Sequence, residues 1–314
     1  MKFAVMGAGA LGCYFGGRLA AAGSDIAFIA RGANLAALRR DGLHIESPLG
    51  DAHVASVSAT DDPAQIGPVD MVLFLVKLYD TETAARQMAP LIGPDTAVVS
   101  FQNGVEARER IGEIVGKQRV LGGTAFIPAD LRAPGIVRHN GPFARLTVGE
   151  FDGRRSERAQ SLNDAFVAAG VEATLVSDMT VRIWEKFIFL SALSAITTLT
   201  RLPLGAILAD NLSHDLFRAA ILETHAVGRA ACPALAEDAG ERGYALAKGF
   251  PPTMRASMLD DLERGKRLEL DSLSGAVVRL GAKHGIATPV HSVVHKALHP
   301  FVGGPPELSA PIHE

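Results

Sequence analysis

The first half of the chain alternates short apolar runs with more polar, helix-forming stretches. Runs rich in Val, Ile, Phe and Ala predict buried strands at 3–6, 25–30, 69–76, 97–100, 120–127 and 171–176. Stretches typical of helices fall between or after them, at 34–41, 81–91 and 156–169. Such alternation predicts an α/β unit with a doubly wound, mostly parallel sheet of the Rossmann type.

Two pairs of segments alternate apolar and polar residues and interrupt that pattern. Residues 43–46 and 52–57 flank Ser47–Asp51, which has the chemistry of a hairpin turn. Residues 135–139 and 144–149 are expected to form an antiparallel pair at the edge of the sheet.

The residue pattern changes near Ser177, where runs of β-branched residues are followed by long patterns with helical periodicity. Helices are expected at 179–200, 213–231, 252–264, 269–284 and 289–298. We therefore expect two domains: residues 1–176 form the Rossmann-like domain, and residues 177–314 form an all-α domain.

A glycine-rich turn follows the first predicted strand and opens a helix. Its residues are Gly7, Ala8, Gly9, Ala10, Leu11 and Gly12. In this spacing Gly7 makes the tight turn, Gly9 leaves room for a pyrophosphate, and Gly12 lets helix and strand pack closely. Glycine-rich turns also end ordinary strands, but here a second strand follows at the βαβ distance. The turn therefore predicts dinucleotide binding.

Arg31 ends the second predicted strand, where an NAD site usually carries Asp or Glu. An arginine there pairs with a 2′-phosphate, which favours NADPH as the cofactor. The alternative is a solvated arginine at a strand end.

Two further polar residues follow predicted strands. Lys77 comes after the run 69–76, and Asn103 comes after 97–100. Ligands of such sheets bind at the carboxyl ends of the strands, so Lys77 is placed to meet the cofactor. The Asn103 amide can bond a nicotinamide, a ribose or a substrate oxygen, although Asn-Gly is equally a common turn pair.

The cofactor supplies neither a proton donor for a substrate oxygen nor contacts that hold the substrate, so the second half of the chain must supply both. Lys186 lies in an unusually apolar predicted helix, and burial lowers the pKa of an ammonium group and readies it to give up a proton. The alternative is a lysine that reaches solvent from an apolar face or pairs with Glu185. A charged stretch at 257–271 is mostly a solvated face, with one carboxylate placed to face a cleft.

Composition narrows the class of protein. The net charge of −3, without a Lys/Arg-rich run, argues against nucleic acid as a partner. Cys13 and Cys232 are far apart, which predicts neither a disulfide framework nor a metal site. No signal sequence and no uninterrupted apolar span is evident, so a cytoplasmic protein without a membrane segment is expected.

Together these motifs resemble the ketopantoate reductase (2-dehydropantoate 2-reductase) family over nearly the whole chain. The resemblance rests on the glycine-rich turn, Arg31, Val76-Lys77, Gln102-Asn103-Gly104, Trp184-Glu185-Lys186-Phe187, Ser257-Met258 and Glu269. It implies that a Rossmann domain binds NADPH, that a helical domain closes over it, and that a 2-oxo acid is reduced to a 2-hydroxy acid. It further implies that Lys186 is the general acid, that Lys77 and Asn103 line the cofactor and substrate site, that Glu269 contacts substrate or cofactor, and that Ser257 holds the substrate carboxylate.

The chain departs from the family at positions that hold the substrate. The family pattern places asparagines where this chain has Leu190, Ser194 and Leu204, so Ser194 is the one polar group left at these positions. A site without those amides suits a less polar 2-oxo acid. Ketopantoate remains the first candidate substrate, a less polar 2-oxo acid is the second, and a non-catalytic NADP(H)-binding redox sensor is the third. The apolar helices are compatible with a homodimer.

Overall fold

The computed structural model describes residues 1–306. By its contacts the chain divides into two compact units. Unit 1 comprises residues 1–102 and 106–182, and unit 2 comprises residues 103–105 and the chain from Ile183 onward. The division falls within one long helix, beyond the position near Ser177 expected from the sequence.

Unit 1 is built on an eight-stranded sheet with the order β12-β11-β8-β7-β6-β1-β2-β5. The pairs are parallel except β8 with β11, which are antiparallel. The strands are β1 (Lys2–Met6), β2 (Asp25–Ile29), β5 (Ser58–Thr60), β6 (Val69–Phe74), β7 (Ile92–Ser100), β8 (Val120–Phe126), β11 (Arg145–Gly149) and β12 (Glu172–Leu175).

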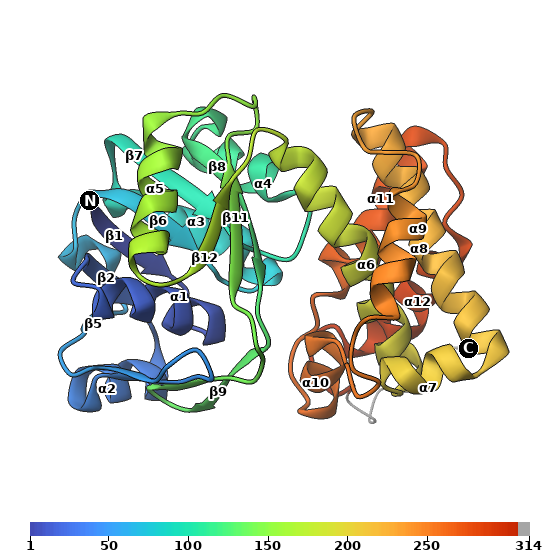
Figure 1. Cartoon of the computed structure of the whole chain (residues 1–314), viewed down its shortest axis with the longest axis horizontal. Helices are drawn as coiled ribbons and strands as arrows, with labels where there is room; N and C mark the ends of the chain where they lie inside the picture. The colour runs from blue at the N-terminus through green and yellow to red at the C-terminus, as the bar shows by residue number, and fades with distance from the viewer. Residues whose placement is uncertain (307–314) are drawn as a thin grey trace. The chain divides into compact units, whose positions relative to one another are not determined.

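Successive side chains of β1 point to opposite faces of this sheet, as the period of a strand requires. Phe3 and Val5 pack in a core with α1 (Ala10–Ala21) and α5 (Glu157–Ala168). Ala4 and Met6 pack in a second core with α3 (Thr81–Gln87) and α4 (Ala107–Val115). Helices therefore cover both faces, which confirms the doubly wound α/β prediction (Figure 1).

A separate four-stranded sheet has the order β4-β3-β10-β9. Its strands are β3 (Leu43–Glu46), β4 (Ala52–Val54), β9 (Ala129–Ala133) and β10 (Ile136–His139). The hairpin of β3 and β4 is confirmed. The expected pairing of 135–139 with 144–149 is wrong, because β10 pairs with β9 and β3 whereas β11 pairs with β8 and β12. The alternating pattern identified each strand but not its partner.

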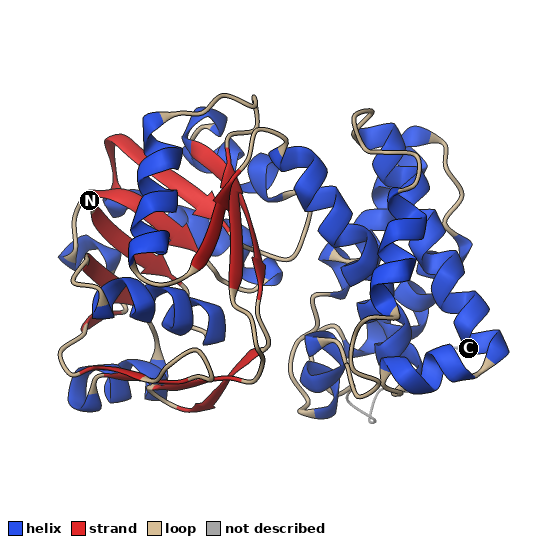
Figure 2. Ribbon diagram, viewed as in Figure 1, coloured by secondary structure: helices blue, strands red, loops and turns tan. Residues whose placement is uncertain are grey.

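Among the described residues, unit 2 is helical (Figure 2). Its helices are the part of α6 (Met179–Thr200) beyond Arg182, α7 (Leu204–Ala209), α8 (Asn211–Ala231), α9 (Ala239–Ala247), α10 (Ser257–Glu263), α11 (Ser274–His284) and α12 (Pro289–Leu298). The all-α prediction is confirmed, and the bounds expected for α6 and α12 are those observed.

Two expected helices are shorter than predicted. The helix predicted from residue 252 begins at Ser257, because the carbonyls of Pro252 and Met254 accept hydrogen bonds from the amides of Gly205 and Leu204 at the start of α7. The helix predicted from Glu269 is a short 3-10 turn, η5 (Leu270–Ser272), followed by α11, and Leu273 breaks the helical path with φ −105° and ψ −93°.

Helix α6 is long and apolar enough to cross a membrane by length and composition, with a mean hydropathy of 1.2 over its most apolar window. That window is 67% buried inside the protein, as in the core helix of a globular domain. The buried residues of α6 include Trp184, Phe187, Ile188 and Ala192.

Candidate active site

The glycine-rich turn between β1 and α1 has the geometry expected from its spacing. Gly7 has φ +105°, a conformation that side chains with a Cβ rarely adopt. A Cβ on Gly12 would lie 2.1 Å from the Gly7 carbonyl oxygen, so only glycine fits where helix and strand pack. A Cβ on Gly9 would meet nothing within 4 Å. The space next to Gly9 is therefore open, as close approach of a ligand requires.

The N-terminus of α1 faces that open space without a side-chain cap. Gly9 is the N-cap residue, and the first turn contains no acidic residue. The first amides of a helix lack intrahelical acceptors and carry the positive end of its dipole. The turn and helix therefore fit the pyrophosphate of a dinucleotide.

Asn34 holds this turn in place, a role that the sequence did not reveal. Its Nδ2 donates to the Ala8 carbonyl at 2.7 Å, and its Oδ1 accepts from the Gly135 amide at 2.8 Å. The only available signal was an asparagine three residues beyond Arg31.

Arg31 is the exposed N-cap residue of α2 (Gly32–Asp41), directly after β2. Its Nη2 donates to Oε1 of Gln87 at the end of α3. Arg31 thus follows the carboxyl end of β2, the position in the chain that the sequence indicated.

Lys77 follows β6 and begins the short turn η2 (Leu78–Asp80). Gln102, after β7, fixes this segment: its Nε2 donates to the Val76 carbonyl at 3.0 Å and to Oγ1 of Thr81 at 2.9 Å. Thr81 in turn donates to the Leu78 carbonyl at 2.8 Å. These bonds join the segments that follow two neighbouring strands, so Gln102 is a positioning residue for the segment that carries Lys77.

Within unit 2, Lys186 and Asn103 are in direct contact. Nζ of Lys186 donates to Oδ1 of Asn103 at 2.8 Å. Glu185, the neighbour that was a candidate partner for the lysine, forms an ion pair with Arg242 at 2.8 Å. Asn103 is therefore more than a turn residue, since its side chain holds the lysine.

Glu269 shares the environment of Lys186. Its side chain is buried, with 7% of the residue exposed. Burial lowers the pKa of Lys186 to about 8, and the charge of Glu269 opposes that decrease. A lysine with this pKa gains and loses its proton near neutral pH, as a general acid must.

The three positions that depart from the family pattern are apolar or buried. Leu190 and Ser194 follow Lys186 by about one and two helical turns on α6, so they lie on its face of the helix. Ser194 is 2% exposed and Leu204, at the start of α7, is 1% exposed. Ser257 is exposed at the first position of α10.

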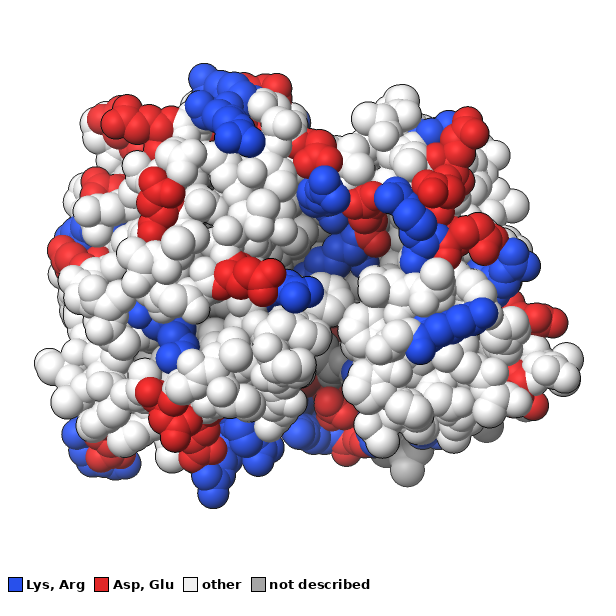
Figure 3. Space-filling view, in the orientation of Figure 1, with Lys and Arg blue, Asp and Glu red and all other residues white. Residues whose placement is uncertain are grey.

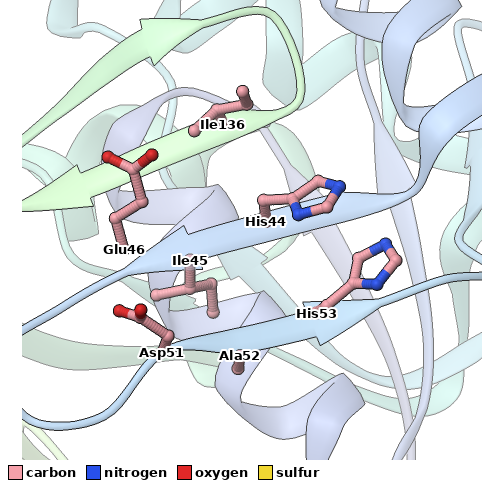
Figure 4. A pocket seen from close by; sticks show the side chains of 7 residues that line it. All are labelled: His44, Ile45, Glu46, Asp51, Ala52, His53 and Ile136. Atoms are coloured by element: carbon pink, nitrogen blue, oxygen red, sulfur yellow. The ribbon is translucent and has the colours of Figure 1, made fainter.

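A pocket elsewhere on unit 1 lies over the four-stranded sheet (Figure 4). The imidazole rings of His44 on β3 and His53 on β4 stack, with their centroids 3.9 Å apart. The carboxylates of Glu46 and Asp51 point away from these rings. The residues expected to form the active site do not line this pocket.

On the face shown in Figure 3, acidic and basic side chains are interspersed on each unit.

Two features define a two-domain oxidoreductase with a Rossmann-like domain: the glycine-rich turn in a doubly wound sheet, and a helical unit with a partly buried lysine whose pKa is lowered. Residues 3–153 match the family model described as "Ketopantoate reductase PanE/ApbA", and residues 178–301 match the model of the C-terminal part of that family. The chain belongs to the ketopantoate reductase family, whose members are NAD(P)H-dependent oxidoreductases acting on CH–OH groups.

Individual relatives agree with this membership. The chain is 32% identical over 305 residues to the "Uncharacterized oxidoreductase YkpB" of Bacillus subtilis, covering 96% of this chain and 99% of the relative. It is 33% identical to a 2-dehydropantoate 2-reductase of Mesorhizobium japonicum, covering 94% and 95%. The crystal structure of a PanE/ApbA family ketopantoate reductase from Ralstonia eutropha is similar with a TM-score of 0.88 and 34% identity, covering 96% and 98%.

Proposed function

We propose that the protein reduces a 2-oxo acid to a 2-hydroxy acid with NADPH, and that Lys186 is the general acid. The observation that carries this proposal is the partly buried Lys186, whose ammonium group donates to Asn103. Desolvation lowers its pKa to about 8, and the charge of Glu269 opposes that decrease. A protein that only senses a nucleotide has no need of such a proton donor. Ketopantoate is the first candidate substrate, by family membership.

NADPH, when bound, supplies the hydride that is added to C2 of the acid. The Lys186 ammonium gives its proton to the carbonyl oxygen of the substrate, and the neutral amine that remains is the base for the reverse reaction. The Asn103 oxygen orients the ammonium group. The Glu269 carboxylate holds the pKa of Lys186 above the value that burial alone would give, so that the proton is present near neutral pH.

The open space next to Gly9 and the uncapped start of α1 support binding of the pyrophosphate. Arg31 is proposed to pair with the 2′-phosphate and so to favour NADPH over NADH. Lys77 is proposed to contact the cofactor, and Ser257 the substrate carboxylate. A cytoplasmic location is part of the same proposal.

A second candidate function is reduction of a less polar 2-oxo acid by the same residues. It is favoured by Leu190 and Leu204, which offer no hydrogen bond to a substrate hydroxyl where the family pattern has amides, and by buried Ser194. The proposed chemistry is unchanged, because Lys186, Asn103 and Glu269 act at the keto acid group that all such substrates share.

The test is NADPH oxidation by the purified protein with ketopantoate, pyruvate, 2-oxoisovalerate and phenylglyoxylate. We expect turnover with at least one of them and loss of turnover in Lys186→Ala. Tight NADPH binding without oxidation by any 2-oxo acid would support the sensor instead.

A further inference from the structure

Three metal-ligating side chains converge on the surface of unit 2, among residues that the proposed reaction does not use. Asp271 lies in η5, His295 lies on α12, and His299 follows one turn later. Their ligand atoms all lie within 4.8 Å of one another. Nε2 of His295 is 2.8 Å from Oδ1 of Asp271, and the two imidazole ring centroids are 5.8 Å apart.

The two histidines are four residues apart on consecutive helical turns, so both rings project from the same face. This spacing is used by helices that bind zinc, and a carboxylate from a second element completes a three-ligand set. Donors around a tetrahedral zinc ion lie about 3.4 Å apart, given bonds of about 2.1 Å. The ligand atoms of the three residues, all within 4.8 Å of one another, are close to that separation.

The donor set also selects the kind of cation. Two imidazole nitrogens and one carboxylate oxygen suit Zn²⁺, whereas Mg²⁺ prefers oxygen ligands and keeps its water. Asp271 and His299 are exposed, so an ion can enter from solvent and water can fill the remaining coordination position. We propose that Asp271, His295 and His299 form a zinc-binding site.

A nearby positive charge limits the affinity of this site. Nη1 of Arg279 donates to the Asp271 carbonyl at 2.8 Å. A Cβ on Gly275 would lie 3.1 Å from Nε2 of His295 and 3.2 Å from Nη1 of Arg279, so the guanidinium is close to the imidazole. Repulsion between the guanidinium and the ion should hold the affinity in the micromolar range.

Zinc at this site would join η5 to α12. The amides of Ser272 and Leu273 both donate to the Glu269 carbonyl at 3.1 Å, so Glu269 is the first residue of the turn that Asp271 belongs to. Bound zinc would therefore restrain the turn that carries Glu269. The site itself does not depend on the proposed reaction.

The experiment is calorimetric titration of the untagged full-length protein with ZnCl₂, with MgCl₂ as the contrasting cation. We expect one Zn²⁺ per chain with micromolar affinity, no comparable Mg²⁺ binding, and a rise in melting temperature with zinc, because an ion that binds the folded state stabilises it. His299→Ala and Asp271→Asn should each weaken zinc binding at least tenfold, and both positions are exposed, so the fold should be retained.

The matched control is His284→Ala, which removes an exposed histidine from the last turn of α11 and should bind zinc like the unmodified protein. The proposal is overturned if the unmodified protein binds no zinc at millimolar concentration, or if His299→Ala and Asp271→Asn bind it as tightly as the unmodified protein. Equal weakening by His284→Ala would also overturn it, since that result indicates nonspecific binding to surface histidines.

Discussion

Nζ of Lys186 donates a 2.8 Å hydrogen bond to Oδ1 of Asn103, a residue 83 positions earlier in the chain. The lysine is on α6, and the asparagine follows β7. This bond holds the ammonium group in place. Burial lowers the pKa of Lys186 to about 8, and the charge of Glu269 opposes that decrease.

Reduction should fall as pH rises through about 8, because the neutral amine of Lys186 has no proton to donate. Oxidation of the 2-hydroxy acid should rise over the same range, because that direction needs the neutral amine as a base. Lys186→Ala should lower kcat for reduction by roughly a hundred- to ten-thousandfold and leave NADPH binding in place. The measurement is kcat against pH in both directions, with a pre-steady-state check that product release is not rate-limiting. Identical pH profiles in the two directions would argue against the role.

Glu269→Gln should move the alkaline fall of kcat for reduction to lower pH. The carboxylate raises the pKa of Lys186, so its removal lets desolvation lower that pKa further below 8. Asn103→Asp is the opposing variant, since a new carboxylate beside Nζ should raise the pKa and move the alkaline fall of kcat to higher pH. The pH profiles of the two variants should thus lie on opposite sides of the unmodified profile. Shifts in the same direction would show that charge does not set this pKa.

Gly9→Ala and Gly12→Ala should have different effects. The Cβ added at Gly9 meets no protein atom within 4 Å, so the melting temperature should change little while NADPH affinity falls. The Cβ added at Gly12 meets the Gly7 carbonyl at 2.1 Å, so the fold itself should be destabilised, by a few kcal/mol as is usual for overpacking. Thermal unfolding and cofactor titration separate the two. Undiminished NADPH affinity in Gly9→Ala would exclude the turn as the pyrophosphate site.

Arg31→Ala should weaken NADPH binding by about 1.5 to 3 kcal/mol, roughly ten- to a hundredfold, and leave NADH binding nearly unchanged. The reason is the loss of charge-assisted hydrogen bonds to the 2′-phosphate. Arg40→Ala removes an exposed arginine from the far end of α2 and serves as the control. Both cofactors are titrated by fluorescence. An equal loss of affinity for NADPH and NADH would show that Arg31 does not bind the 2′-phosphate.

Leu190→Asn should improve kcat/KM for ketopantoate, because the amide can bond a polar substrate at one turn from Lys186. Each buried hydrogen bond that a substrate hydroxyl fails to form costs about 1 to 3 kcal/mol of binding free energy. The unmodified protein should therefore reduce some apolar 2-oxo acid at least as well as it reduces ketopantoate. Leu190→Met keeps the position apolar and should leave the substrate preference unchanged. If the unmodified protein strongly prefers ketopantoate and Leu190→Asn only harms it, the pocket is organised differently.

The sequence by itself determined the features that depend on local pattern. Apolar runs and the 7–12 glycine spacing predicted the α/β sheet and its turn, because strand period, helix period and the demand for a positive φ at Gly7 are set by a few neighbouring residues. The bounds of α6 followed in the same way from one long helical repeat.

The tertiary structure decided which distant segments meet. Strand β10 joins β3 and β9 instead of β11, and the carbonyls of Pro252 and Met254 bond the amides at the start of α7 instead of extending a helix. The contact of Lys186 with Asn103 likewise joins segments that only the folded chain brings together. Periodicity fixes which face of an element is buried, but its partner is fixed by packing and hydrogen bonding over the whole unit, so no local pattern reveals it.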